Sequence, residues 1–187
     1  ACEMVAEVLQ YIGDDGIKIK PAEADAMYAG IVIDTNNFMN QAGVRTFEAA
    51  AFLRRNGADV VRVRKLFRDR LEDYRARAEA IQKAEIYHGA FAISVCPSEG
   101  LESPTVVGAQ AANELLDIVG IKASFILTQM GDTIYFSARS IDEINVQIIM
   151  ERLGGGGHRT IAGAQLKGAT IDEAREKLKD LITDMME

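Results

Sequence analysis

Four consecutive glycines, Gly154 to Gly157, follow a helical pattern and stand directly before His158. Glycine adopts positive φ at no steric cost, so this run lets the backbone turn sharply and approach a ligand closely. Successive backbone amides in such a turn can also converge on an anion. The run lacks the lysine of a Walker motif and the spacing of a dinucleotide-binding fingerprint. Both an anion site and a simple tight connection are therefore open for this segment.

The residues around the glycines, 85–187, predict a compact α+β unit. Its expected elements are a strand over 86–95, a helix over 104–119, strands over 121–129 and 133–140, a helix over 144–153 and a terminal helix from Thr170. Apolar and polar residues alternate along 133–140, so Tyr135, Ser137 and Arg139 share one polar face. An arginine at that place can hold a phosphate in a bidentate fork.

The first 57 residues predict a remnant of a parallel sheet with helices. Residues 2–12 have helical spacing, the apolar run 28–34 is typical of a buried strand, and Thr46 is expected to cap a helix ending at Arg55. Asp34 would then leave the carboxyl end of a strand, where ligands collect in parallel sheets. Such a carboxylate can bind a divalent cation or form a cap or turn, and both remain open.

Residues 58–84 are charge-rich and contain neither glycine nor proline, which predicts one long connecting helix. Acidic residues are interleaved with the basic ones, which favours a solvated helix over a nucleic-acid-binding arm.

Composition limits the kind of ligand. The chain has 187 residues, with 21 Lys plus Arg against 28 Asp plus Glu and a net charge of -7. Non-specific electrostatic binding of DNA or RNA is therefore not expected. An anionic ligand must therefore be held by a local site. Two cysteines without CxxC spacing and two histidines argue against a disulfide framework and a three-histidine metal site.

Four segments are similar to the DHH/DHHA1 phosphoesterases, and most closely to cyclic-di-AMP phosphodiesterases of the GdpP type. They are YAGIVIDTNNF over 28–38, RTFEAAAFLRRNGAD over 45–59, FSARSIDEINVQIIMERLGGGGH over 136–158 and the following IAGAQL. The resemblance covers essentially the whole chain. The glycine-histidine element and the motif ending in Phe38 are shared across the superfamily, whereas the block before Gly154 points more narrowly to the cyclic-dinucleotide branch.

The resemblance implies an α/β protein with three parts. These are the C-terminal part of a DHH domain with a truncated parallel sheet over 1–57, a connecting helix over 58–84, and a DHHA1 substrate-binding domain with a mixed sheet over 85–187. It also implies a parent enzyme that uses two Mn²⁺ ions to hydrolyse cyclic-di-AMP to linear pApA. The upstream metal motifs of the family have no counterpart here, so the 187 residues are expected to bind substrate without hydrolysing it.

The resemblance assigns roles to eight residues. Asp34 matches a metal-ligating aspartate, and the substrate-binding positions are Ser137, Arg139, Ser140, Gly155, Gly156, Gly157 and His158. The expected partner is a cyclic dinucleotide or a short oligonucleotide, and no duplex DNA. It further implies a cytoplasmic domain whose parent is attached to the bacterial cell membrane. A homodimer is consistent with the family, but no pattern in the sequence predicts one.

Two other functions remain open. One is a related phosphoesterase that degrades short oligoribonucleotides or single-stranded DNA, because it shares the glycine-histidine element. The other is a non-catalytic DHHA1 module that binds nucleic acid, as in the appendages of alanyl-tRNA synthetases. An aromatic content of 6% is low for a platform on which bases stack.

Overall fold

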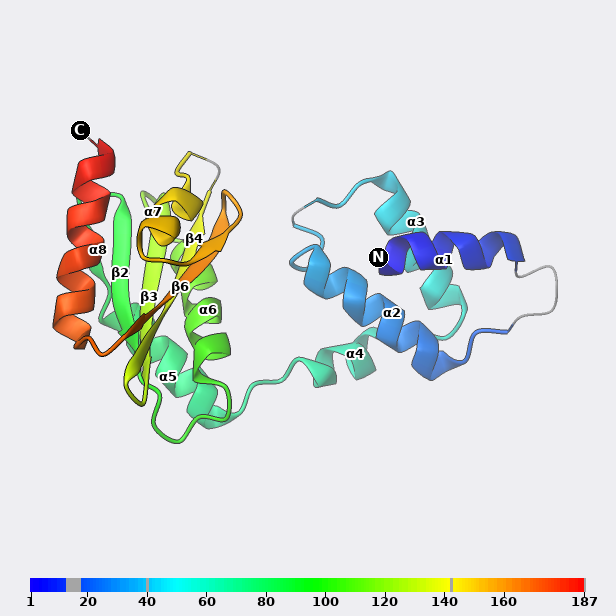
Figure 1. The fold of residues 1–187 in the computed structure, drawn as a ribbon. Coiled ribbons are helices and arrows are strands. Elements are labelled where there is room, and N and C mark those ends of the chain that lie inside the picture. Colours follow the sequence, from blue (N-terminus) through cyan, green and yellow to red (C-terminus); the bar gives the residue numbers. More distant parts are fainter. Residues whose placement is uncertain (13–17, 40, 142, 187) are drawn as a thin grey trace. The chain divides into compact units, whose positions relative to one another are not determined.

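A computed structural model describes residues 1–12, 18–39, 41–141 and 143–186. The chain divides into two compact units, Ala1–Arg68 and Asp69–Glu187, each of which is described separately (Figure 1). No helix among the described residues is long and apolar enough to cross a membrane.

The first unit is built from helices. They are α1 (Cys2–Ile12), α2 (Pro21–Asp34), α3 (Val44–Arg55) and α4 (Val60–Leu66). Small and apolar side chains from α1, α2 and α3 form its core, among them Ala6, Ala24, Ile31, Ala49 and Leu53. The helices expected near 2–12 and 46–55 are confirmed, although α3 begins two residues before Thr46.

The strand expected over 28–34 is wrong, because these residues form the second half of α2. The helix begins at Pro21, and the Glu23 carboxylate accepts a hydrogen bond from the Lys20 amide at 2.9 Å. The helix then continues through the β-branched run and packs Ile31 into the core at 2% exposure. Tertiary packing therefore overrides local β-propensity. The parallel sheet expected here has no strand in the described part of this unit.

The second unit is a mixed sheet with helices on both faces. Its elements are α5 (Leu71–Gln82), β1 (Glu85–Tyr87), β2 (Phe91–Cys96), α6 (Pro104–Leu115), β3 (Ala123–Met130), β4 (Thr133–Ser140), α7 (Val146–Arg152), β5 (Gly156–Gly157), β6 (Ile161–Lys167) and α8 (Ile171–Met186). The strand order is β1-β2-β3-β4-β6-β5, in which β2 and β3 are parallel and all other neighbours are antiparallel. The α/β class and the mixed sheet are thus confirmed.

Two expected elements are each divided in the structure. The single connecting helix becomes α4 and α5, with residues 67–70 between them, so α4 lies in the first unit and α5 in the second. The single strand over 86–95 becomes the hairpin of β1 and β2, which turns at His88 and Gly89 with φ of 46° and 72°. Glycine at position 89 favours this turn, because it adopts positive φ at no steric cost.

Each face of the sheet has its own core. One face packs against α7 and α8, with Phe125, Phe136 and Leu178 at its centre. The other packs against α5 and α6, with Leu115 and Ile126 buried there. Among the strands, α6 contacts mainly β3 and β4, and Ile161 and Gln165 on the same side of β6 are exposed.

Candidate functional site

The polar face of β4 is the centre of the candidate site. Burial alternates along the strand: Ile134, Phe136 and Ala138 are buried, whereas Tyr135 and Ser137 are half-buried. The expected alternation is therefore confirmed. The open face of β4 presents hydroxyl groups and the Arg139 side chain on the same side as α6.

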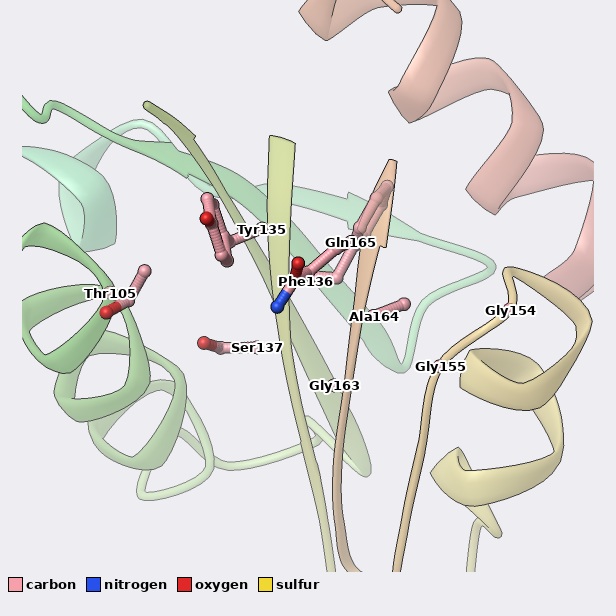
Figure 2. Close-up of a pocket in the computed structure, with 9 residues that line it drawn as sticks. All are labelled: Thr105, Tyr135, Phe136, Ser137, Gly154, Gly155, Gly163, Ala164 and Gln165. Carbon is pink, nitrogen blue, oxygen red and sulfur yellow. The ribbon is translucent and has the colours of Figure 1, made fainter. Parts of the chain in front are cut away.

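A pocket of about 340 Å³ lies over this face (Figure 2). Its floor comes from β4 and β6, whose register places Tyr135 opposite Gln165 and Ser137 opposite Gly163. Thr105 on α6 lines one side of the pocket, and Gly154 and Gly155 line another. The structure thus brings together Ser137 and Gly155, two of the residues expected to bind substrate.

Arg139 lies on the same face of β4, two residues beyond Ser137, and it is half-buried. Its Nε donates a hydrogen bond to Asn113 Oδ1 of α6 at 3.0 Å, and its Nη1 donates to the carbonyl of Ala138 at 2.9 Å. Burial lowers the pKa of the Arg139 guanidinium from its ordinary value, yet an arginine remains charged at neutral pH. No Asp or Glu among the described residues forms an ion pair with it.

The glycine run forms a tight connection. The amides of Gly154 and Gly155 donate to the carbonyls of Glu151 and Met150, which closes α7 in a Schellman motif with Gly154 at φ 80°. The amide of His158 donates to the carbonyl of Ile161 at 2.7 Å. The amides of Gly154, Gly155 and His158 are therefore engaged within the chain and are not free to bind an anion.

Gly155 is required by the close approach of two backbones. A Cβ atom at this position would lie 2.1 Å from the Gly163 carbonyl oxygen and 2.6 Å from the Ala164 Cα atom. At Gly156, by contrast, an added Cβ would meet nothing within 4 Å. Gly155 therefore lets the segment after α7 pack directly against the backbone of β6. No side chain projects from this position into the pocket.

His158 is exposed and lies in the turn between β5 and β6. Its backbone exchanges hydrogen bonds with Ile161, which stands opposite Arg139 in the ladder of β4 and β6. His158 and Arg139 therefore come from neighbouring segments at the same end of the sheet. No hydrogen bond joins their side chains within the described part of the chain.

Ser140 lies on the opposite face of β4 from Ser137 and Arg139. Its hydroxyl is buried and donates to the carbonyl of Ile144 at 2.6 Å. The structure therefore does not bring this hydroxyl to the pocket, although the sequence grouped it with the substrate-binding residues.

Asp34 belongs to the first unit and lies at the end of α2, with a side chain that is 64% exposed. It lines a separate hollow of about 340 Å³ together with Glu3 and Thr35. Across the described ranges, no three His, Cys, Asp or Glu side chains gather closely enough to hold a metal ion. The residues described here therefore do not fit a two-metal centre.

Three polar residues of the site were not predicted from the sequence: Thr105, Asn113 and Gln165. Alternation along 161–167 could have placed Gln165 on one face with Gly163. Nothing local indicates that α6 lies over β4, which is what brings Thr105 and Asn113 to this face. The sequence pattern therefore could not predict that Thr105 and Asn113 belong to the site.

Comparison with known families and proteins gives one domain match. A family model described as the DHHA1 domain matches residues 90–184. These residues include β2 to β6 and the whole pocket.

Curated relatives match nearly the whole chain, and two of them illustrate the similarity. The cyclic-di-AMP phosphodiesterase GdpP of Geobacillus thermodenitrificans is 44% identical over 99% of this chain and 28% of its own length. The cyclic-di-AMP phosphodiesterase PdeA of Listeria monocytogenes is 42% identical over 94% of this chain and 27% of its own length. The chain thus spans less than a third of these relatives.

A solved structure shares the fold. An exopolyphosphatase-related protein from Bacteroides fragilis matches 98% of this chain and 56% of its own chain, with a TM-score of 0.83 and 20% sequence identity.

Proposed function

The chain belongs to the DHHA1 domain family, and from this premise we propose that it is the substrate-binding part of a phosphodiesterase that hydrolyses cyclic-di-AMP to linear pApA. Both curated relatives are named as cyclic-di-AMP phosphodiesterases, which supports the substrate class. We further propose that residues 1–57 are the C-terminal part of a DHH domain, that 58–84 connect the two parts, and that 85–187 form the DHHA1 domain.

The observation that carries this proposal is the isolated charge of Arg139. A guanidinium that has lost much of its hydration is costly unless an anion or hydrogen-bond acceptors replace the water. Two neutral acceptors, Asn113 Oδ1 and the Ala138 carbonyl, engage Nε and Nη1. Neither of them neutralises the charge. A ligand phosphate that reaches Nη2 would supply the missing anion and a charge-assisted hydrogen bond.

The neighbouring residues suit the same ligand. Ser137 stands on the same face of β4 and can donate its hydroxyl to a phosphate or ribose oxygen. Gly155 keeps the adjoining wall free of side chains, so that a ligand can lie against the backbone. His158 follows the glycine run in an exposed turn and can donate from its imidazole to a phosphate at the rim of the site.

Mn²⁺ is implied by the resemblance, but the described residues do not fit a metal pair. Asp34 would contribute one ligand, and we propose that the others come from the remainder of a longer protein. We therefore assign no metal-dependent step to these 187 residues. Their proposed role is to bind and orient the dinucleotide.

Isothermal titration of the chain with cyclic-di-AMP, pApA and a ten-nucleotide RNA tests the proposal. We expect the dinucleotides to bind more tightly than RNA, because the net charge of -7 opposes a long polyanion. Arg139→Gln should weaken dinucleotide binding about tenfold or more. Arg175→Gln, on α8, is the matched control and should leave it unchanged. RNA that outcompetes both dinucleotides would instead favour the single-strand nuclease or nucleic-acid-binding module.

Membrane attachment of the parent, a cytoplasmic location of this domain and homodimerisation remain predictions. The gene sequence upstream of the codon for Ala1 tests membrane attachment. If the parent is attached to the membrane, this sequence encodes hydrophobic spans of about 20 residues. Sedimentation analysis of the chain tests the third.

A further inference from the structure

The pocket over β4 and β6 is polar but carries no charge. None of its lining residues is charged, and its polar side chains are those of Thr105, Tyr135, Ser137 and Gln165. The nearest part of a nucleotide that shares this character is the base, which is planar and neutral and carries hydrogen-bonding groups on its edges. The phosphate, in contrast, needs the cation of Arg139, which lies farther along β4.

The hydrogen-bonding groups of the pocket are available. Within the described ranges, the side chains of Thr105, Tyr135, Ser137 and Gln165 make no hydrogen bond to another residue. Gln165 is exposed, and its amide offers one acceptor oxygen and two N–H donors. A glutamine amide can pair with the acceptor and the donor that lie side by side on an adenine edge.

The pocket also offers an aromatic ring and open backbone. Tyr135 is half-buried and stands directly opposite Gln165 in the β4–β6 ladder. Figure 2 shows Tyr135 on β4 and Gln165 on β6, with Gly163 farther along β6 and Gly155 on the neighbouring segment after α7. Bases of single-stranded ligands are commonly held by an aromatic ring together with hydrogen bonds to their edges.

We propose that this pocket is a nucleobase site, in which the Gln165 amide pairs with the edge of an adenine and Tyr135 contributes the aromatic contact. The inference rests on the proposed function, because Arg139 would hold the phosphate that leads into the pocket. It adds a determinant of base preference, which the phosphate contacts alone do not provide.

Gln165→Glu is the sharpest variant, because it changes the hydrogen-bonding pattern without changing the size of the side chain. A carboxylate accepts two N–H groups, which the guanine edge offers, and it repels the ring-nitrogen acceptor of adenine. The ratio of the dissociation constants for pGpG and pApA should therefore fall about tenfold. Gln129→Glu, a substitution of the same charge on the opposite face of the sheet, is the control and should leave the ratio unchanged.

A titration with adenosine, which has no phosphate, tests the pocket independently of Arg139. In ¹⁵N-labelled protein the side-chain amide of Gln165 should shift on addition of adenosine and should not shift with ribose 5-phosphate.

The outcomes separate the two proposals. One outcome is that Arg139→Gln weakens pApA binding while Gln165→Glu leaves the ratio of the pGpG and pApA dissociation constants unchanged. In that case the nucleobase site is wrong and the phosphate site stands. If adenosine shifts Gln165 but Arg139→Gln leaves pApA binding intact, the proposed phosphate contact is wrong. If neither ligand binds the wild-type chain, both proposals fail.

Discussion

Asn113 Oδ1 on α6 accepts a hydrogen bond from Arg139 Nε on β4 at 3.0 Å. The bond links a helix to a strand across the face that bears the pocket. Because Nη1 also donates to the Ala138 carbonyl, two contacts fix the plane of the guanidinium before any ligand arrives. We regard Asn113 as a positioning residue, since it acts on a phosphate through Arg139.

Replacing Asn113 should weaken binding without unfolding the protein. In Asn113→Ala the guanidinium loses one of its two anchors, and we expect the affinity for pApA to fall about five- to tenfold. Asn113 is exposed, so the melting temperature should change little. Calorimetric titration and thermal unfolding monitored by circular dichroism measure the two effects.

Asn113→Asp separates positioning from a purely structural contact. It keeps an oxygen at the same place but adds a negative charge that would compete with the ligand for Arg139. Affinity should therefore fall although the hydrogen bond survives. If Asn113→Asp instead bound pApA as tightly as the wild type, the charge of Arg139 would not contribute to ligand binding.

Gly155→Ala should destabilise the second unit by about 1 to 3 kcal/mol, because the new methyl group would overlap the Gly163 carbonyl and the Ala164 backbone. Gly156→Ala is the matched control. Its Cβ would enter open space, so its unfolding free energy should stay within about 0.5 kcal/mol of the wild type. Urea unfolding measures both variants. Equal stability of the two would contradict the close approach of this segment to β6.

Ser140→Ala should affect stability but not ligand affinity. The substitution removes the donor to the Ile144 carbonyl and should cost about 1 kcal/mol. Ligand binding should be unchanged, since the side chain lies on the face of β4 away from the pocket. A loss of pApA affinity in a variant that remains folded would restore Ser140 to the substrate-binding residues.

Asp25 should make the first unit sensitive to acid. The Arg62 guanidinium, which donates from Nε at 2.7 Å, and the Asp59 amide lower the pKa of this carboxyl below its ordinary value. A lowered pKa in the folded state contributes stability above the unfolded value of about 3.9, and this stability is lost as the pH falls through the folded value.

A ¹³C NMR titration of the Asp25 carboxyl tests this expectation. Arg62→Ala should raise the pKa of Asp25 toward the ordinary value, whereas Arg64→Ala, an exposed arginine in the same helix, should not. An equal effect of both substitutions would mean that the specific pair does not hold the carboxylate.

Local patterns predicted the polar face of β4 correctly, because alternation with a period of two is a property of the strand itself. They failed at Ile31, Val32 and Ile33, where a β-branched run suggested a strand. The helix start at Pro21 and the packing against α1 and α3 decide the structure there. Asp34 consequently lies at the end of a helix rather than of a strand.

The remaining parts of the site depend on contacts between distant segments. The β4–β6 register places Gln165 opposite Tyr135, and the docking of α6 brings Asn113 to Arg139. No short-range signal in the sequence specifies either contact. The glycine run shows the same limit. Its composition does not reveal that the amides of Gly154 and Gly155 complete the end of α7.

The most direct test of the account is a titration of the ¹⁵N-labelled chain with pApA, observed by NMR at the Arg139 Nε–H group and at the amides of Ser137 and Gly155. We predict that these three resonances shift together and saturate, while the amides of α8 remain in place. Saturable shifts confined to α8 or to the first unit, with the Arg139 Nε–H resonance unchanged, would contradict it.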